Sequence, residues 1–131
     1  MQKKGKLFII SGPSGSGKST IIEALLKKRP ELRYSISYTT RPPRGNEKDG
    51  EDYYFISKNA FEERMRSGDF AEWAEVHGHF YGTSAAYIEK TLAKGKAILL
   101  DIDVVGARKL LGRFPDATSI FVAPPTMDIL E

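Results

Sequence analysis

The sequence predicts an α/β fold in which a parallel sheet carries a phosphate-binding loop and a smaller α+β subdomain is inserted. Three observations support this prediction. Residues 12–19 read GPSGSGKS and match the pattern G-x-x-x-x-G-K-[ST]. A short apolar strand, residues 6–10, precedes this loop, and an amphipathic helix follows it. A nearly continuous apolar run at residues 97–103 predicts another strand that is buried on both faces.

Size and composition fit one soluble globular domain. The chain has 131 residues, of which 40% are hydrophobic and 28% charged. The net charge of +3 comes from basic residues that are spread along the chain, which argues against a nucleic-acid partner and suits anionic nucleotides. There is no cysteine, so disulfides and thiolate metal sites are excluded. No signal peptide or membrane span is evident, so we expect no membrane partner and a cytoplasmic location.

The first half of the chain is predicted from periodicity and from turn residues. The first helix should end near Arg29, because Pro30 cannot continue it. Alternation at residues 70–76 predicts a strand with Glu72 on the same face as Phe70. The other predicted elements are a strand at 33–38, a polar loop at 39–51, a strand at 53–56, a helix at 58–67 capped by Ser57 and stopped by Gly68, and a turn-rich stretch at 77–83.

The second half is predicted to return to the core. It contains a helix at 84–94, the strand at 97–103, a helix at 106–113, a buried strand at 119–123 and the opening turn of a helix at 126–131. We therefore expect a single domain, residues 1–131, with a core at 1–34 and 84–131 and a subdomain at 35–83. Ligands of such sheets bind at the carboxyl ends of the strands. Two ligand-facing parts suggest a two-substrate enzyme that closes around its reaction.

The loop has the groups that bind a nucleoside triphosphate. Its backbone N–H groups and the positive end of the following helix attract phosphate oxygens. Lys18 is expected to reach the β- and γ-phosphates, and the Ser19 hydroxyl is expected to bind Mg²⁺. Asp101 ends an apolar run, as does the carboxylate beside Mg²⁺ in phosphate-loop enzymes; the alternative is a capping or solvated aspartate. Asp103 should point to the same face and is a candidate contact for a second substrate.

The polar loop and the nearby aromatic residues have candidates for binding a second phosphate. Arg41 and Arg44 flank two prolines that fix the backbone, and two guanidinium groups can grip one phosphate. The alternative is solvated surface charge. Tyr53 and Tyr81 either pack as half-buried aromatic residues or donate hydroxyl hydrogen bonds to a phosphate.

Glu72 is the most informative single carboxylate. A glutamate on an apolar strand face is costly unless it has a partner. A carboxylate accepts two hydrogen bonds, and guanine presents two adjacent donors, N1–H and N2–H₂, whereas adenine presents an acceptor at N1. The hydroxyls of Ser37 and Thr83 are candidates for donating to guanine O6. The alternative is a glutamate that faces solvent or pairs with an arginine.

Taken together, these segments resemble the guanylate kinase family. The resemblance extends over essentially the whole chain, and the combination of motifs is far more specific than any one of them. The matching segments, in order, are residues 12–20, 35–44 (SISYTTRPPR), 50–55 (GEDYYF), 70–74 (FAEWA), 81–83 (YGT), 100–103 (LDID) and 123–125 (APP).

The resemblance implies a P-loop nucleoside monophosphate kinase-like fold and the reaction ATP + GMP ⇌ ADP + GDP, with Mg²⁺ as the metal and no covalent enzyme intermediate. It implies that ATP is bound by Gly12, Pro13, Ser14, Gly15, Ser16, Gly17, Lys18, Ser19 and Thr20. It implies that the GMP phosphate is held by Arg41, Arg44, Tyr53 and Tyr81, and the guanine by Ser37, Glu72, Thr83 and Asp103. The implied catalytic residues are Lys18, Arg41 and Asp101, and the implied metal ligands are Ser19 and Asp101. Whether the protein forms a homodimer is left open.

Two other functions are weighed against this one. Scaffold proteins related to the family bind phosphorylated peptides without catalysis, but they typically lose the phosphate loop that is intact here. Another phosphoryl-transfer enzyme acting on a different phosphate acceptor is a second alternative, against which Glu72 and Ser37 argue. The family continues beyond Glu131 into a lid with arginines and further core segments. We therefore expect these 131 residues to be a fragment that binds nucleotides and is catalytically impaired.

Overall fold

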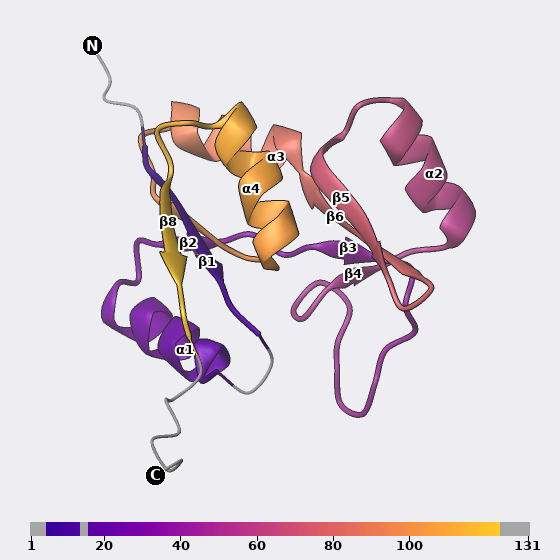
Figure 1. The fold of residues 1–131 in the computed structure, drawn as a ribbon, viewed down its shortest axis with the longest axis horizontal. Coiled ribbons are helices and arrows are strands. Elements are labelled where there is room, and N and C mark those ends of the chain that lie inside the picture. Colours follow the sequence, from indigo (N-terminus) through magenta and orange to yellow (C-terminus); the bar gives the residue numbers. More distant parts are fainter. Residues whose placement is uncertain (1–4, 14–15, 124–131) are drawn as a thin grey trace, which may run out of the picture.

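The computed structural model describes residues 5–13 and 16–123, which form two layered parts side by side (Figure 1). In chain order the elements are β1 (Leu7–Ser11), α1 (Lys18–Lys28), β2 (Arg33–Tyr34), β3 (Tyr38–Thr39), β4 (Tyr54–Phe55), α2 (Lys58–Arg66), β5 (Phe70–Val76), β6 (His79–Ser84), α3 (Ala85–Ala93), β7 (Ile98–Asp101), α4 (Val104–Arg113) and β8 (Thr118–Phe121). Within the described ranges, one sheet has the order β2-β7-β1-β8 with parallel pairs, and the other has the order β4-β3-β6-β5. The predicted α/β class with a parallel sheet is confirmed.

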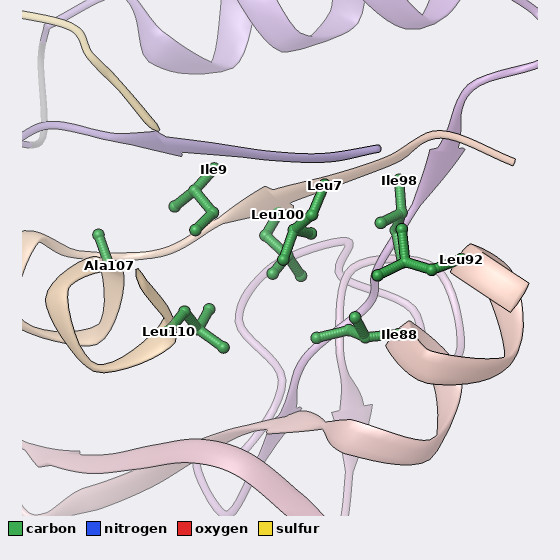
Figure 2. Packing of buried hydrophobic residues seen from close by; sticks show 8 residues of the cluster. All are labelled: Leu7, Ile9, Ile88, Leu92, Ile98, Leu100, Ala107 and Leu110. Carbon is green, nitrogen blue, oxygen red and sulfur yellow. The ribbon is translucent and has the colours of Figure 1, made fainter. Parts of the chain in front are cut away.

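The parallel sheet is covered by helices on both faces because its two central strands, β1 and β7, are apolar except for their last residues, Ser11 and Asp101. Successive side chains of a strand point to opposite faces. Leu7, Ile9, Ile98 and Leu100 pack against α3 and α4, whose contributions are Ile88, Leu92, Ala107 and Leu110 (Figure 2). On the other face, Ile10 and Leu99 pack against Ile22 of α1. The buried packing fixes where the carboxyl ends of β1 and β7 lie, and these ends carry the phosphate loop and Asp101.

The predicted strand at residues 33–38 is wrong as a single element. β2 pairs with β7 in the parallel sheet, whereas β3 pairs with β4 and β6 in the second sheet. Residues 35–37 between them belong to neither strand, although the Ser35 N–H still donates to the Leu99 carbonyl at 3.0 Å. Alternation extends through both strands, so the pattern alone cannot show that the chain changes sheets.

The predicted turn-rich stretch at residues 77–83 is also wrong in its extent. Only residues 77 and 78 form the turn, and residues 79–84 form β6, which pairs with β5 as an antiparallel hairpin. His77 and Gly78 have φ values of 50° and 80°. Two successive positive φ values are typical of the two-residue hairpin turn whose twist matches that of the strands. The glycine and histidine residues in this stretch led to the prediction of a turn, so β6 was not predicted as a strand.

Glu72 does not share a face with Phe70, contrary to the prediction. The register of the hairpin shifts between Phe70 and Glu72, which marks a β-bulge. The Phe70 ring packs on Phe61 of α2, with 4.6 Å between ring centroids. Glu72 and Ala74 instead line a cavity on the opposite side of the strand. The bulge thus turns Glu72 away from the aromatic cluster and towards the parallel sheet.

Other boundaries follow the predictions more closely. Ser57 caps α2 by accepting from the Ala60 N–H at 3.1 Å, as predicted. α4 begins at Val104 rather than at residue 106, because Asp103 is its N-cap.

The strand predicted as buried at 119–123 is β8, and its predicted burial is wrong. β8 is an edge strand among the described residues, and all four of its side chains are exposed. The helical turn predicted at 126–131 lies outside the described residues. None of the described helices has the length and apolar character needed to cross a membrane.

Candidate active site

A cavity of about 770 Å³ opens where the two sheets face each other. It is lined from the parallel sheet by the loop after β1, the start of α1 and the residues that follow β7. From the second sheet it is lined by β5, β6 and the segments that precede β3 and β4. The sequence-predicted site residues that line it are Gly12, Pro13, Gly17, Lys18, Ser19, Ser37, Tyr53, Glu72, Tyr81, Asp101 and Asp103. The two halves of the predicted site therefore share one cavity.

The phosphate loop leads directly into α1. Gly17 is the N-cap, and its φ of 89° lies in the left-handed region that favours glycine. Lys18, the first helical residue, donates from Nζ to the Gly12 carbonyl at 3.1 Å and to Asp101 Oδ1 at 2.9 Å. Ser16 Oγ is buried and has no hydrogen-bond partner among residues 5–13 and 16–123. Ser14 and Gly15, two predicted ATP-binding residues, lie outside the described residues.

The residues predicted to bind Mg²⁺ are suited to that ion. Ser19 and Asp101 both line the cavity and supply a hydroxyl and a carboxylate, the hard oxygen ligands that Mg²⁺ accepts. Within residues 5–13 and 16–123 no group of three or more histidine, aspartate or glutamate side chains is arranged to hold a metal. A site of one or two protein oxygens, completed by phosphate oxygens and water, is the usual arrangement for Mg²⁺ bound with a nucleotide.

The Glu72 carboxylate is buried, with 7% of the residue exposed. Its Oε2 accepts a hydrogen bond from Thr83 Oγ1 at 3.1 Å. Burial is the largest influence on its pKa and raises it above the ordinary glutamate value, and the negative charge of Asp103 raises it further. The Thr83 hydrogen bond and the positive charge of Lys109 act in the opposite direction. The site thus holds a carboxylate that faces a cavity and accepts one side-chain hydrogen bond from the part of the chain that the structure describes.

Asp103 has two roles in the geometry. Its Oδ1 accepts from the Gly106 N–H at 2.7 Å and so caps α4. The same residue lines the cavity beside Glu72. Thr83, in contrast, does not line the cavity and contacts it only through the hydrogen bond to Glu72.

Arg41 is held by partners that the sequence analysis missed. Its guanidinium is paired with Glu47, with distances of 2.9 Å from Nη1 to Oε1 and 3.1 Å from Nη2 to Oε2. Its Nε donates to the Tyr81 hydroxyl at 3.2 Å, and its guanidinium lies 5.1 Å from the centre of the Tyr53 ring. The residue is only 5% exposed and does not itself line the cavity. The signal that was available is the acidic residue six positions after Arg41 in the same loop.

The Arg41–Glu47 pair also orders the polar loop. Glu47 Oε1 accepts from the Arg44 N–H at 2.8 Å. The Arg41 hydrogen bonds lower the pKa of Glu47, so this carboxylate stays charged. Tyr53 is partly buried, which raises the pKa of its hydroxyl and keeps it protonated as a donor, against the opposing effect of Arg41. Two predicted residues, Arg44 and Thr20, are exposed and do not line the cavity.

The chain matches known proteins along nearly its whole length. The family model described as guanylate kinase matches residues 4–131. A guanylate kinase of Symbiobacterium thermophilum is 53% identical over 98% of this chain and 61% of its own length. A guanylate kinase of Trichormus variabilis is 48% identical over 97% of this chain and 64% of its own length.

A solved structure supports the same assignment. The crystal structure of guanylate kinase from Anaplasma phagocytophilum aligns with a TM-score of 0.83 at 36% identity, over 98% of this chain and 64% of that chain. The chain thus spans about three fifths of the length of the curated relatives that it matches. The phosphate loop, the cavity shared by two sheets and the match of residues 4–131 lead to one conclusion: this chain belongs to the guanylate kinase family.

Proposed function

We propose that the protein is a nucleoside monophosphate kinase that transfers the γ-phosphoryl group of ATP to GMP, giving ADP and GDP. The single observation that carries this proposal is the shared cavity, in which the phosphate loop with Lys18 and Asp101 faces Glu72 and Tyr81. A donor and an acceptor bound at these two ends would meet inside one enclosure, and positioning is the main requirement of phosphoryl transfer. Family membership supports the same activity.

Each of the two substrates is assigned to its own part of the chain. Residues 35–83 form the GMP-binding subdomain, and residues 1–34 and 84–131 form the ATP-binding core. The change from one sheet to the other at residues 35–37 supports this boundary. A cytoplasmic location stays a prediction, and the oligomeric state stays open.

Guanine recognition is assigned to Glu72, with Ser37, Asp103 and Thr83 around it. The two carboxylate oxygens would accept from guanine N1–H and N2–H₂, which supplies the partners that a buried carboxylate needs. Thr83 holds the carboxylate by the hydrogen bond to Oε2. Adenine offers an acceptor where guanine offers N1–H, so an adenine base would leave Glu72 buried and unpaired.

The GMP phosphate is assigned to Tyr53, Tyr81, Arg41 and Arg44. The tyrosines line the cavity. Arg41 contacts both tyrosines, because its Nε donates to the Tyr81 hydroxyl and its guanidinium lies over the Tyr53 ring. Its positive charge would strengthen both hydroxyls as donors to a phosphate. Glu47 fixes the guanidinium in that place, and Arg44 approaches from the exposed side of the loop.

The donor phosphates are assigned to residues 12–20. The backbone of the loop and the start of α1 would bind the phosphate oxygens, with Lys18 beside the β- and γ-phosphates. Ser19 and Asp101 would hold Mg²⁺, which supplies neutralisation of the charge on those phosphates. The Lys18 ammonium group donates to the Gly12 carbonyl and to Asp101, and these contacts hold it at the wall of the cavity.

A coupled assay of ADP formation from ATP tests the proposal, with GMP, dGMP, AMP, CMP and UMP compared as acceptors. We expect turnover with GMP, and far less with AMP, CMP and UMP. A scaffold module would form no ADP with any acceptor while still binding nucleotide or phosphopeptide. An enzyme with another acceptor would prefer one of the other monophosphates, which would contradict the assignment of Glu72.

Replacement of Lys18 tests the donor site. Lys18→Met removes the ammonium group beside the β- and γ-phosphates and should lower turnover by orders of magnitude, because that charge is needed during transfer. The fold and GMP binding should persist, since the residue lies outside the acceptor half of the cavity. Steady-state rates and GMP titration on the same preparation check both parts. Near-normal turnover would remove the role assigned to the loop.

Replacement of Glu72 tests the acceptor site. Glu72→Gln offers one acceptor and one mismatched donor to guanine, so GMP affinity should fall by about 2–3 kcal/mol. Calorimetric dissociation constants for the two proteins give the difference, and ATP affinity serves as the internal control. An unchanged GMP constant would show that Glu72 does not bind the base.

The same variant should change the pH dependence of stability. The pKa of Glu72 is raised in the folded protein, so the native state holds this proton more tightly than the unfolded chain does. The wild type therefore loses stability as pH rises from the ordinary glutamate range through the raised pKa. Without nucleotide, Glu72→Gln should melt at a higher temperature than the wild type near neutral pH, and the difference should vanish below about pH 4. A constant difference across this range would contradict the raised pKa.

Chain length gives a further prediction about catalysis. The residues assigned to GMP all lie within residues 37–103, so residues 1–131 should bind GMP. The lid arginines that the family resemblance implies would lie beyond this span, and one such arginine can be worth about 10³–10⁵ in rate. We expect residues 1–131 to turn over at least roughly a thousandfold slower than a chain as long as the relatives. Equal rates for the two lengths would mean that residues 12–103 contain the whole catalytic apparatus.

A further inference from the structure

Gly106 lies in the first turn of α4, at the point where this helix meets β5. The glycine is buried, and its N–H donates to Asp103 Oδ1 at 2.7 Å. Its backbone φ is not among the positive values, so the conformation itself does not require glycine. Glycine is also a poorer helix former than alanine. The presence of glycine at position 106 therefore needs another physical explanation.

That explanation is the close approach of Glu72. A Cβ atom added to Gly106 would lie 2.6 Å from Glu72 Oε1, 3.2 Å from Glu72 Cδ and 3.1 Å from Asp103 Oδ1. Optimal separations between non-bonded heavy atoms are about 3.5–4.0 Å, so Oε1 occupies the space that a methyl group would take. The other carboxylate oxygen is tied to Thr83 at 3.1 Å. The carboxylate is thus set between β6 and the first turn of α4.

We infer that Gly106 is a positioning residue for guanine recognition, because its missing side chain lets the Glu72 carboxylate lie against α4 while it faces the cavity. This inference rests on the proposed role of Glu72 as the acceptor for guanine. Any side chain at residue 106 forces the carboxylate to move, since the end of a glutamate side chain yields more readily than a helix backbone.

The test compares two alanine substitutions on the same helix. Gly106→Ala introduces the conflicting Cβ, whereas Gly112→Ala is the matched control because a Cβ there meets nothing within 4 Å. Calorimetric titration with GMP, IMP and ATP is combined with thermal unfolding. Gly106→Ala should weaken GMP binding roughly 10- to 100-fold, the range expected for lost hydrogen bonds to a charged group. ATP binding should be unchanged, and Gly112→Ala should bind all three nucleotides as the wild type does.

The comparison with IMP separates loss of base recognition from general damage. IMP lacks the 2-amino group and keeps N1–H, so it forms fewer hydrogen bonds with the carboxylate than GMP does. Displacement of the carboxylate should therefore reduce the preference for GMP over IMP. Equal losses for GMP, IMP and ATP, or GMP binding at the wild-type constant, would overturn the inference.

A second comparison uses protein that already carries Glu72→Ala. In Glu72→Ala protein the carboxylate is gone, so adding Gly106→Ala should cause no further loss of GMP affinity. If Gly106→Ala alone does not fold, adding Glu72→Ala should restore folding; failure to do so would locate the conflict elsewhere and overturn the inference. Absence of GMP binding by the wild type would contradict the proposed function. Loss of GMP binding in Glu72→Gln but not in Gly106→Ala would contradict only the role of Gly106.

Discussion

One buried carboxylate, with a single side-chain hydrogen bond from the described residues, constrains the rest of the site. Glu72 is 7% exposed, accepts one hydrogen bond from Thr83, and has a raised pKa because burial and Asp103 disfavour its charge. A charged group held in this way is costly to the free protein. A ligand that brings hydrogen-bond donors would offset this cost, and guanine, the base of the proposed substrate, has two. Specificity of this kind would be strong, because a base without those donors would leave the carboxylate unpaired.

The position of this carboxylate links the two halves of the molecule. β5 belongs to the second sheet, and α4 covers the parallel sheet whose strands carry the phosphate loop (Figure 1). Glu72 lies against the first turn of α4, Asp103 caps that turn, and Lys109 of the same helix donates to the Trp73 carbonyl at 3.2 Å. The two ends of the cavity, which we propose bind the phosphate acceptor and donor, therefore share a structural support. A change in the distance between the sheets would alter both ends together.

The core of the fold could be predicted from the sequence because its signals are local. The phosphate loop, the apolar strands and the serine cap at Ser57 each depend on neighbouring residues. The errors arose where a distant partner decides the outcome. β2 and β3 continue one alternating pattern yet pair in different sheets, β6 is defined by its pairing with β5, and the bulge near Ala71 turns Glu72 away from Phe70. In the site, the Arg41–Glu47 pair lies within one loop and had a local signal in the acidic residue six positions after Arg41, whereas the contact between Gly106 and Glu72 joins distant segments and had none.

In the proposed function, the incompletely paired Glu72 carboxylate accepts hydrogen bonds from guanine N1–H and N2–H₂ when GMP binds. Carbon-13 NMR of glutamate carboxyl groups, assigned by comparison with Glu72→Gln, measures its pKa in the free and GMP-bound protein. We expect a pKa above the ordinary glutamate value in the free protein and a clear fall when GMP binds, because two donated hydrogen bonds favour the charged form. A Glu72 pKa that is ordinary in the free protein, or that does not change when GMP binds, would show that this carboxylate does not bind guanine.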